Sequence, residues 1–187
     1  MTEQNEIHIT AEMTPNPNTL KFNVDRELIE SGAYDFPNKD AAKNSYLASE
    51  LFEIGNVTGV YIAKDFITVT KTVETGWQAL ASTLIEKIKA AIQSGQKLVS
   101  ESAVPSTNAA GDGVVEQKIR QVLDQEIRPA VARDGGDIIF YGYKDGIVTL
   151  HLQGACSSCP SSIMTLKMGV ENRLKQVVPE IKEVIQV

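Results

Sequence analysis

The chain is poor in the side chains that most often bind transition metals. Its 187 residues include two cysteines, Cys156 and Cys159, and two histidines, His8 and His151. A tetrahedral zinc site or an iron–sulfur cluster usually takes four protein ligands. One copy of the chain therefore cannot complete a thiolate site. Either the two cysteines form a redox-active dithiol, or two copies come together around a metal.

Other absences exclude whole classes of protein. No apolar run approaches the roughly 18 residues of a membrane-spanning helix. The polar, acidic first residues, MTEQNE, resemble neither a signal peptide nor an Arg-rich transit peptide. The net charge of −6 argues against general affinity for nucleic-acid phosphates, which require a basic surface. We therefore expect no membrane or nucleic-acid partner. The bacterial cytoplasm is the simplest location, and the mitochondrial matrix is the alternative.

Composition predicts two domains joined by a linker. Residues 96–113 are rich in Ser, Ala, Gly and Pro and have little apolar periodicity, which is typical of a flexible tether. This divides the chain into a first domain of residues 1–95 and a second domain of residues 114–187. Residues 1–113 carry 9 basic and 15 acidic side chains, whereas residues 114–187 carry 9 of each. The net negative charge therefore belongs to the first part of the chain.

The first domain is predicted to have the element order ββαββα. Apolar patterns indicate strands at residues 7–13, 18–24, 57–63 and 66–71, and a helix at about residues 42–53. A second helix is indicated by one apolar stripe with spacings of three and four, formed by Trp77, Leu80, Leu84, Ile88 and Ile92. We expect this stripe to face the core.

The second domain is predicted as αββα with a short last strand, which makes the whole chain an α+β protein of two small α/β domains. Its first helix has an apolar face from Val115 to Ile127 and is expected to end near Pro129. The paired glycines of residues 134–137 (DGGD) allow left-handed backbone geometry and are predicted to turn the chain into the sheet. A last strand is expected within residues 181–187.

The sequence also predicts the register of a hairpin in this domain. Asp145-Gly146 between two apolar strands is a strong two-residue turn signal. Counting outward from that turn pairs Tyr143 with Val148, Tyr141 with Leu150 and Ile139 with Leu152 on one apolar face. His151 then points to the other face of the sheet and is not expected to bind metal.

The second hairpin strand leads into the cysteines and a last helix. Pro160 fits the first turn of a helix, which places Cys159 near the N-cap and Cys156 in the loop before it. The positive end of the helix dipole favours thiolate there. The core stripe of this helix is formed by Ile163, Leu166, Val170, Leu174 and Val177. Met164 and Met168 flank that stripe and are expected to pack rather than to bind metal.

Three hypotheses remain open on the residues alone. A thioredoxin-type thiol–disulfide oxidoreductase would use a strand, CxxC and a helix, but only 28 residues follow Cys159, too few for the rest of that sheet. A zinc ion could instead bridge two copies as a structural site. The third hypothesis is an iron–sulfur cluster shared by a homodimer, since two CxxC motifs supply the four thiolates of a [4Fe–4S] cluster. A shared cluster lies at the surface, and this suits delivery.

At this point the chain resembles a known family. The second domain is similar to the C-terminal domain of NifU-like (Nfu-type) iron–sulfur cluster scaffolds and carriers in residues 127–130 (IRPA), 134–137 (DGGD), 154–162 (GACSSCPSS), 165–171 (TLKMGVE) and 178–180 (VPE). The first domain is similar to the N-terminal domain that accompanies it, in residues 14–22 (TPNPNTLKF), 51–52 (LF) and 65–71 (DFITVTK), followed by Trp77. This ordered set of motifs is far more specific than CxxC alone.

The resemblance implies a protein that binds a [4Fe–4S] cluster between two subunits through Cys156 and Cys159 of each chain. It implies that the protein transfers this cluster to apo iron–sulfur proteins. It also implies that cluster-assembly proteins upstream donate the cluster. Transfer by ligand exchange needs no general base or nucleophile, so we do not expect an enzyme. The first domain contains no cysteine. We therefore expect it to recognise recipients or to regulate docking.

Overall fold

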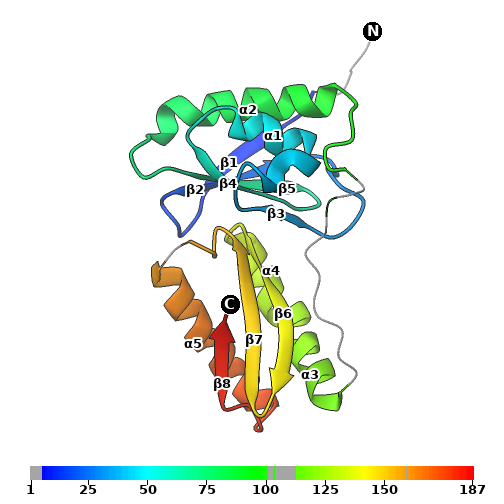
Figure 1. The fold of residues 1–187 in the computed structure, drawn as a ribbon, viewed down its shortest axis with the longest axis vertical. Coiled ribbons are helices and arrows are strands. Elements are labelled where there is room, and N and C mark those ends of the chain that lie inside the picture. The colour runs from blue at the N-terminus through cyan, green and yellow to red at the C-terminus, as the bar shows by residue number, and fades with distance from the viewer. Residues whose placement is uncertain (1–5, 101–102, 104–112, 159) are drawn as a thin grey trace. The chain divides into compact units, whose positions relative to one another are not determined.

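The computed structural model describes residues 6–100, 103, 113–158 and 160–187, with only the backbone for residues 160–163 and 165. The chain forms two compact units, Met1–Ser106 and Thr107–Val187 (Figure 1). Much of the predicted linker, residues 101–102 and 104–112, lies outside the described residues. No helix in the described part of the chain combines the length and the apolarity that crossing a bilayer requires.

The first unit is an antiparallel sheet covered on one face by helices (Figure 1). The strand order is β1-β2-β5-β4-β3, and every neighbouring pair is antiparallel. Its elements are β1 (Ile9–Met13), β2 (Thr19–Val24), β3 (Tyr34–Phe36), η1 (Ala41–Asn44), α1 (Tyr46–Phe52), β4 (Val57–Ile62), β5 (Phe66–Lys71) and α2 (Trp77–Gln93).

Period-two and helical patterns explain this unit. Leu20 and Phe22 of β2 are buried in the same core as Leu84 and Ile88 of α2, which confirms the predicted elements. β3 was not predicted because three residues carry too little periodicity to be recognised. The η1 turn precedes α1 where a single helix was predicted, since Ser45 ends the turn and caps α1 by accepting a hydrogen bond from the backbone N–H of Ala48.

The packed part of this unit extends past the predicted domain boundary at residue 95. Leu98 and Val99 are buried in its core. The Leu98 carbonyl accepts hydrogen bonds from the Ser45 hydroxyl at 2.8 Å and from the Leu47 N–H at 3.3 Å. The start of the predicted linker is thus part of the first fold, because two apolar side chains among small polar residues are enough to pack it.

The second unit is a three-stranded sheet with the order β6-β7-β8. β6 and β7 form an antiparallel hairpin, and β8 joins β7 in parallel. The helices pack on one face, where Ile119, Val131, Leu150 and Leu174 share a core. The elements are α3 (Val114–Val122), η2 (Leu123–Ile127), α4 (Arg128–Arg133), β6 (Gly136–Lys144), β7 (Ile147–Gly154), α5 (Pro160–Val177) and β8 (Glu183–Gln186).

The prediction that the first helix of this unit ends near Pro129 is wrong. The helical path continues through a π-helical turn, η2, and then through α4 as far as Arg133. Pro129 lies in the first turn of α4. A proline is tolerated there because its missing N–H falls where a new helical segment begins.

The hairpin turn is confirmed, but part of its register is not. Asp145 and Gly146 both have positive φ, 53° and 88°, as a type I′ turn requires. Tyr143 pairs with Val148 as predicted. A β-bulge between Phe140 and Gly142 then adds a residue to β6, so Phe140 pairs with Leu150 and Ile138 with Leu152.

The bulge exchanges the predicted core residues for their neighbours. Ile138 and Phe140, both 1% exposed, face the helices, while Tyr141 is 54% exposed. His151, which pairs with Ile139, lies on the face away from the helices, as predicted. There its Nδ1 lies 2.6 Å from a terminal oxygen of Val187, and its ring meets that of Tyr141 edge to face.

Candidate metal centre

The cysteine loop connects the end of β7 to the start of α5. Cys156 lies two residues after Gly154, the last residue of β7, and α5 begins at Pro160, as the sequence predicted. Cys156 is 5% exposed and belongs to the core of the second unit. Cys159 lies outside the described residues, so its predicted place near the helix N-cap stays a prediction.

Backbone hydrogen bonds fix the shape of the loop before the helix. Gly154 has a φ of 62°, which lets the chain leave β7 in a left-handed conformation. The Gly154 carbonyl accepts hydrogen bonds from the Ser157 hydroxyl at 2.8 Å and from the Ser157 N–H at 3.2 Å. The Ala155 N–H donates to the carbonyl of Gly135 at 3.1 Å. The loop is thereby tied to the turn that precedes β6.

That turn contains the two glycines of the DGGD motif, and they have different tasks. Gly135 has a φ of 80° and ends α4. Gly136 lies directly against the cysteine loop: a Cβ added there would be 2.7 Å from the Cys156 Sγ and 2.8 Å from the carbonyl oxygen of Gln153. Gly136 is therefore needed for its lack of a side chain rather than for backbone freedom.

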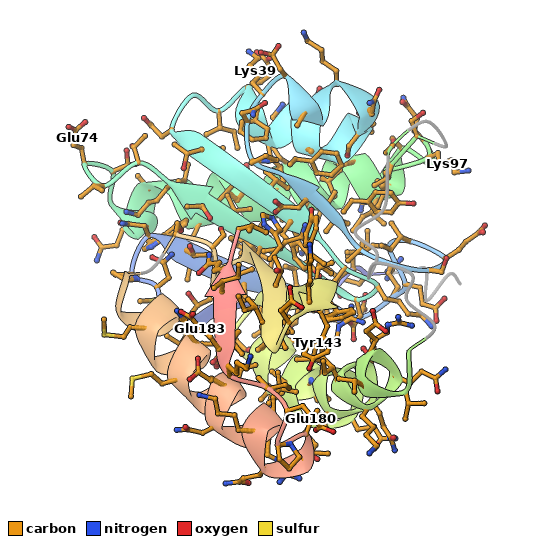
Figure 2. All side chains as sticks on the ribbon, turned by 60° about the horizontal axis from the view of Figure 1, so that its bottom comes forward. Lys39, Glu74, Lys97, Tyr143, Glu180 and Glu183 are labelled. Carbon is orange, nitrogen blue, oxygen red and sulfur yellow. The ribbon has the colours of Figure 1, made fainter. Side chains whose placement is uncertain are left out.

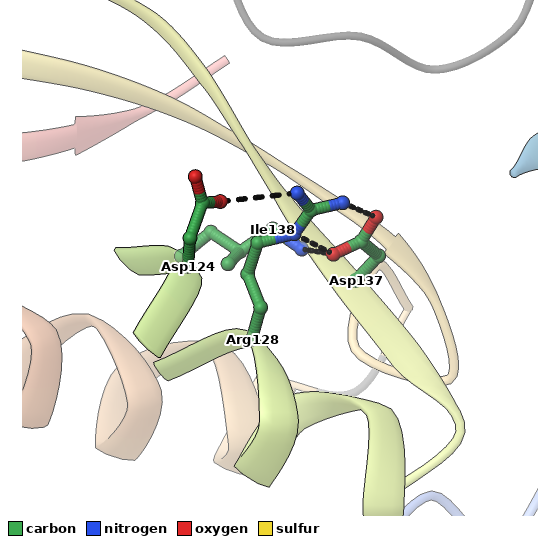
Figure 3. Close-up of polar contacts among 4 residues, drawn as sticks. All are labelled: Asp124, Arg128, Asp137 and Ile138. Atoms are coloured by element: carbon green, nitrogen blue, oxygen red, sulfur yellow. Dashed lines mark hydrogen bonds and ion pairs between the residues drawn. The ribbon is translucent and has the colours of Figure 1, made fainter. Parts of the chain in front are cut away.

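An ion-pair network holds the same turn from the other side (Figure 3). Arg128 of α4 donates from Nε and Nη2 to the two carboxylate oxygens of Asp137, both at 2.8 Å, and from Nη1 to Asp124 at 3.1 Å. Asp137 is 5% exposed and also accepts the N–H of Ile138 at 2.8 Å. The hydrogen bonds to Asp137 raise the pKa of Arg128 further above its ordinary value, which outweighs the opposing effect of desolvation. This paired charge fixes the start of β6 beside Cys156.

The two thiols of this chain suit a soft metal whose remaining ligands come from another molecule. Thiolates select zinc, copper(I) and iron–sulfur clusters. Among the described residues, no group of three or more His, Cys, Asp or Glu side chains could hold a metal ion. Met164 and Met168, predicted to pack, are instead 68% and 61% exposed. The chain therefore offers the thiols of Cys156 and Cys159 and, within the described part, no nearby set of ligands to complete a site.

Sequence reasoning proposed the two cysteines as ligands but did not predict which residues pack around Cys156. The contact of Gly136 with Cys156 and the pairing of Arg128 with Asp137 join segments 20 and 9 residues apart. The signal was present, since all of these residues fall inside the motifs that carry the resemblance. Their spacing along the chain alone does not reveal which of them touch.

Comparison with known proteins identifies both parts of the chain. Residues 119–185 match the model of the NifU-like domain, and residues 9–95 match the model of the scaffold protein Nfu/NifU N terminal. The chain is 46% identical over 182 residues to the human protein named NFU1 iron-sulfur cluster scaffold homolog, mitochondrial, covering 96% of this chain and 71% of that protein. The protein of the same name from Drosophila sechellia is 41% identical over 183 residues, which cover 96% of this chain and 64% of the relative.

Among the solved structures that match part of the chain is a NifU-like protein from Saccharomyces cerevisiae, determined by solution NMR. It is 26% identical with a TM-score of 0.48, and the match covers 55% of this chain and 92% of that one. The two domain models cover residues 9–95 and 119–185 of this chain, and the match to the human relative spans 96% of it. The chain belongs to the Nfu family of iron–sulfur cluster scaffold proteins.

Proposed function

We propose that two copies of this chain hold one [4Fe–4S] cluster through Cys156 and Cys159 of each copy and pass it to apo-proteins. The observation that carries this proposal is the cysteine loop itself. It holds Cys156 shortly before α5, and Cys159, the only other cysteine of the chain, directly precedes Pro160 in the sequence; the dipole at the start of a helix favours thiolate. Two such loops supply the four thiolates that the cluster requires.

The cluster is cargo, and its release is ligand exchange. Thiolates of a recipient replace those of the two loops at iron one after another, and no proton donor or nucleophile of this chain takes part. The protein is accordingly a carrier and not an enzyme. Because each copy contributes half of the ligands, any contact that separates the two copies weakens the site. Cluster release is thus coupled to the dimer.

Cluster binding must make the buried thiol of Cys156 accessible. The sulfur lies in the core of the second unit, and the side chain is 5% exposed. The neighbouring Ser157 and Ser158 are exposed, so an outward shift of the loop uncovers chiefly the buried side chains of Ala155 and Cys156. We expect the loop to move while the Gly135–Gly136 turn and the Arg128–Asp137 pair keep its base in place.

The partners follow from this role. Recipients are apo iron–sulfur proteins, and the donors are cluster-assembly proteins upstream. The first unit, which has no cysteine, is proposed to recognise recipients or to regulate docking. The human and Drosophila relatives are named as mitochondrial proteins. This favours the mitochondrial matrix, the alternative of the sequence analysis, as the place to test.

The experiment combines anaerobic reconstitution with single cysteine variants. Wild-type protein incubated with iron and sulfide should gain the visible absorption of a [4Fe–4S] cluster, whereas Cys156→Ser and Cys159→Ser should not retain it after desalting. Ser158→Ala is the matched control. Ser158 lies between the two proposed ligands but has no thiol, so this variant should bind the cluster normally. A cysteine variant that keeps a full complement of iron and sulfide would refute the shared site. Colourless wild-type protein that cycles between dithiol and disulfide would support the oxidoreductase hypothesis instead, and a colourless zinc dimer the structural one.

A further inference from the structure

We propose that Met164 and Met168 of α5, here called the methionine stripe, form the contact surface on which the second copy of the chain packs in the cluster-bound dimer. This inference rests on the proposed function, because it assigns the surface that surrounds the shared cluster. It adds an apolar contact between chains that the four thiolates alone do not provide.

The methionine stripe is an apolar surface that the fold of its own unit leaves uncovered. Met164 and Met168 are 68% and 61% exposed. They lie one turn apart on the same side of α5, about 120° around the helix from Val170 and Leu174, which are 1% and 0% exposed and face the core. Methionine is flexible and polarisable and is enriched in the cores of protein interfaces. Two exposed methionines on one helix face are therefore suited to contact another protein.

The position of the stripe along the helix indicates which protein that is. α5 begins at Pro160, directly after the CxxC motif. With a rise of about 1.5 Å per residue, Met164 lies about 6 Å and Met168 about 12 Å along the axis from that start. A second copy that contributes thiolates to the same cluster must approach this end of the helix. The first three turns of α5, which carry the stripe, are then within its reach.

Charge supports a second copy rather than a charged partner. Glu171 and Lys175, near the stripe, pair at 2.6 Å, and Lys167 lies 3.8 Å from Glu183 of β8, which Figure 2 labels. Residues 114–187 carry equal numbers of acidic and basic side chains. Two copies of this unit, whose net charge is zero, are not driven apart by net charge, and a strongly acidic or basic partner finds no opposite net charge on the unit.

Gly169, about 100° around the helix from Met168, leaves a neighbouring face of α5 open. A Cβ added to Gly169, which follows Met168, would meet no heavy atom within 4 Å. The helix surface is thus open at this point, and another chain can approach its backbone.

A charge-exchange experiment tests the proposal on the full-length chain. In one variant Met164 and Met168 both become Glu, and in the other both become Lys. Like charges then face each other in each homodimer, so we expect cluster-bound dimer to dissociate at least about tenfold more readily for either variant alone. An equimolar mixture carrying different affinity tags should restore mixed dimer to about the wild-type level at low salt, where charges are weakly screened.

Met13→Glu is the matched control, because Met13 of β1 is 72% exposed in the other unit and should leave the dimer unchanged. Normal cluster-bound dimers of both double variants, with or without slower transfer to recipients, would overturn the proposal, as would a mixture that fails to restore the dimer. If wild type and Met13→Glu also fail to form a cluster-bound dimer, the proposed function itself fails, and this inference fails with it.

Discussion

Gly136 packs so closely against Cys156 that a single added carbon at its Cα would lie 2.7 Å from the sulfur. The same carbon would lie 2.8 Å from the backbone carbonyl of Gln153, which cannot move without disturbing β7. The start of β6 and the proposed ligand Cys156 are therefore packed directly against each other. A substitution at the start of β6 should therefore alter how much cluster the protein retains.

Gly136→Ala should lower the amount of cluster retained by the protein, because the methyl group collides with the Gln153 carbonyl and displaces the turn that holds the base of the Cys156 loop in place. It should also destabilise the fold by about 1–3 kcal/mol, which is typical of overpacking. Iron content after desalting and thermal unfolding of the apo-protein check the two effects. Gly142→Ala is the matched control in the same strand, since a Cβ there meets nothing within 4 Å. Equal cluster retention in Gly136→Ala and wild type would contradict this account.

The Arg128–Asp137 pair should contribute far more to stability than the similar pair of Arg173 with Glu126. Arg128→Met leaves the buried Asp137 carboxylate without its main partner and should cost about 2–3 kcal/mol. Arg173→Met breaks a pair whose side chains are 41% and 42% exposed and should cost less than about 1 kcal/mol. Urea unfolding of both variants measures the difference. A cost for Arg173→Met as large as that for Arg128→Met would show that burial of the carboxylate is not the deciding factor.

The bulge in β6 can be tested by comparing alanine substitutions at two neighbouring residues, Phe140 and Tyr141. Phe140→Ala removes a side chain that is 1% exposed and should cost about 3–5 kcal/mol, whereas Tyr141→Ala removes one that is 54% exposed and should cost under about 1 kcal/mol. The regular register predicted from the sequence requires the reverse order. Chemical denaturation of the two variants therefore decides between the registers.

Acid should weaken the attachment of β8 to α5. The hydrogen bond from Lys175, followed by that from the Val184 N–H, lowers the pKa of Glu171 below its ordinary value of 4.5. A carboxylate with a lowered folded-state pKa contributes stability that is complete above its unfolded pKa and is lost as the pH falls through the folded pKa. The Glu171→Gln variant should be less stable than wild type at pH 7, by under about 1 kcal/mol because the group is partly exposed. The difference should shrink below about pH 4.5, and a constant difference from pH 7 to pH 3 would exclude this contribution.

The elements that sequence predicted well are those with strong local signals. The α2 stripe from Trp77 to Ile92, the Asp145-Gly146 turn and Pro160 at the start of α5 each depend on residues close together in the chain. The predictions that were wrong failed at local irregularities of the backbone. A bulge at Phe140–Gly142 shifts by one residue every pair on the side of the bulge away from the hairpin turn. The π-helical turn before Pro129 lets a helix continue where a proline normally stops it.

The candidate site shows the same division. The two cysteines stand out because they are so few, and their spacing indicates their chemistry. The support of Cys156 by Gly136, and of the β6 start by Arg128, is a property of the folded chain. The exposure of Met164 and Met168 was also missed, since residues that flank a core stripe can fall on either side of the boundary with solvent.

The most direct test of the account is native mass spectrometry of the anaerobically reconstituted protein. The proposed carrier predicts one species with the mass of two chains and four iron and four sulfide ions, which returns to the apo-protein mass when a chelator removes the iron. A single chain that holds a complete [4Fe–4S] cluster would contradict the shared site, because the chain has only two thiols to bind it.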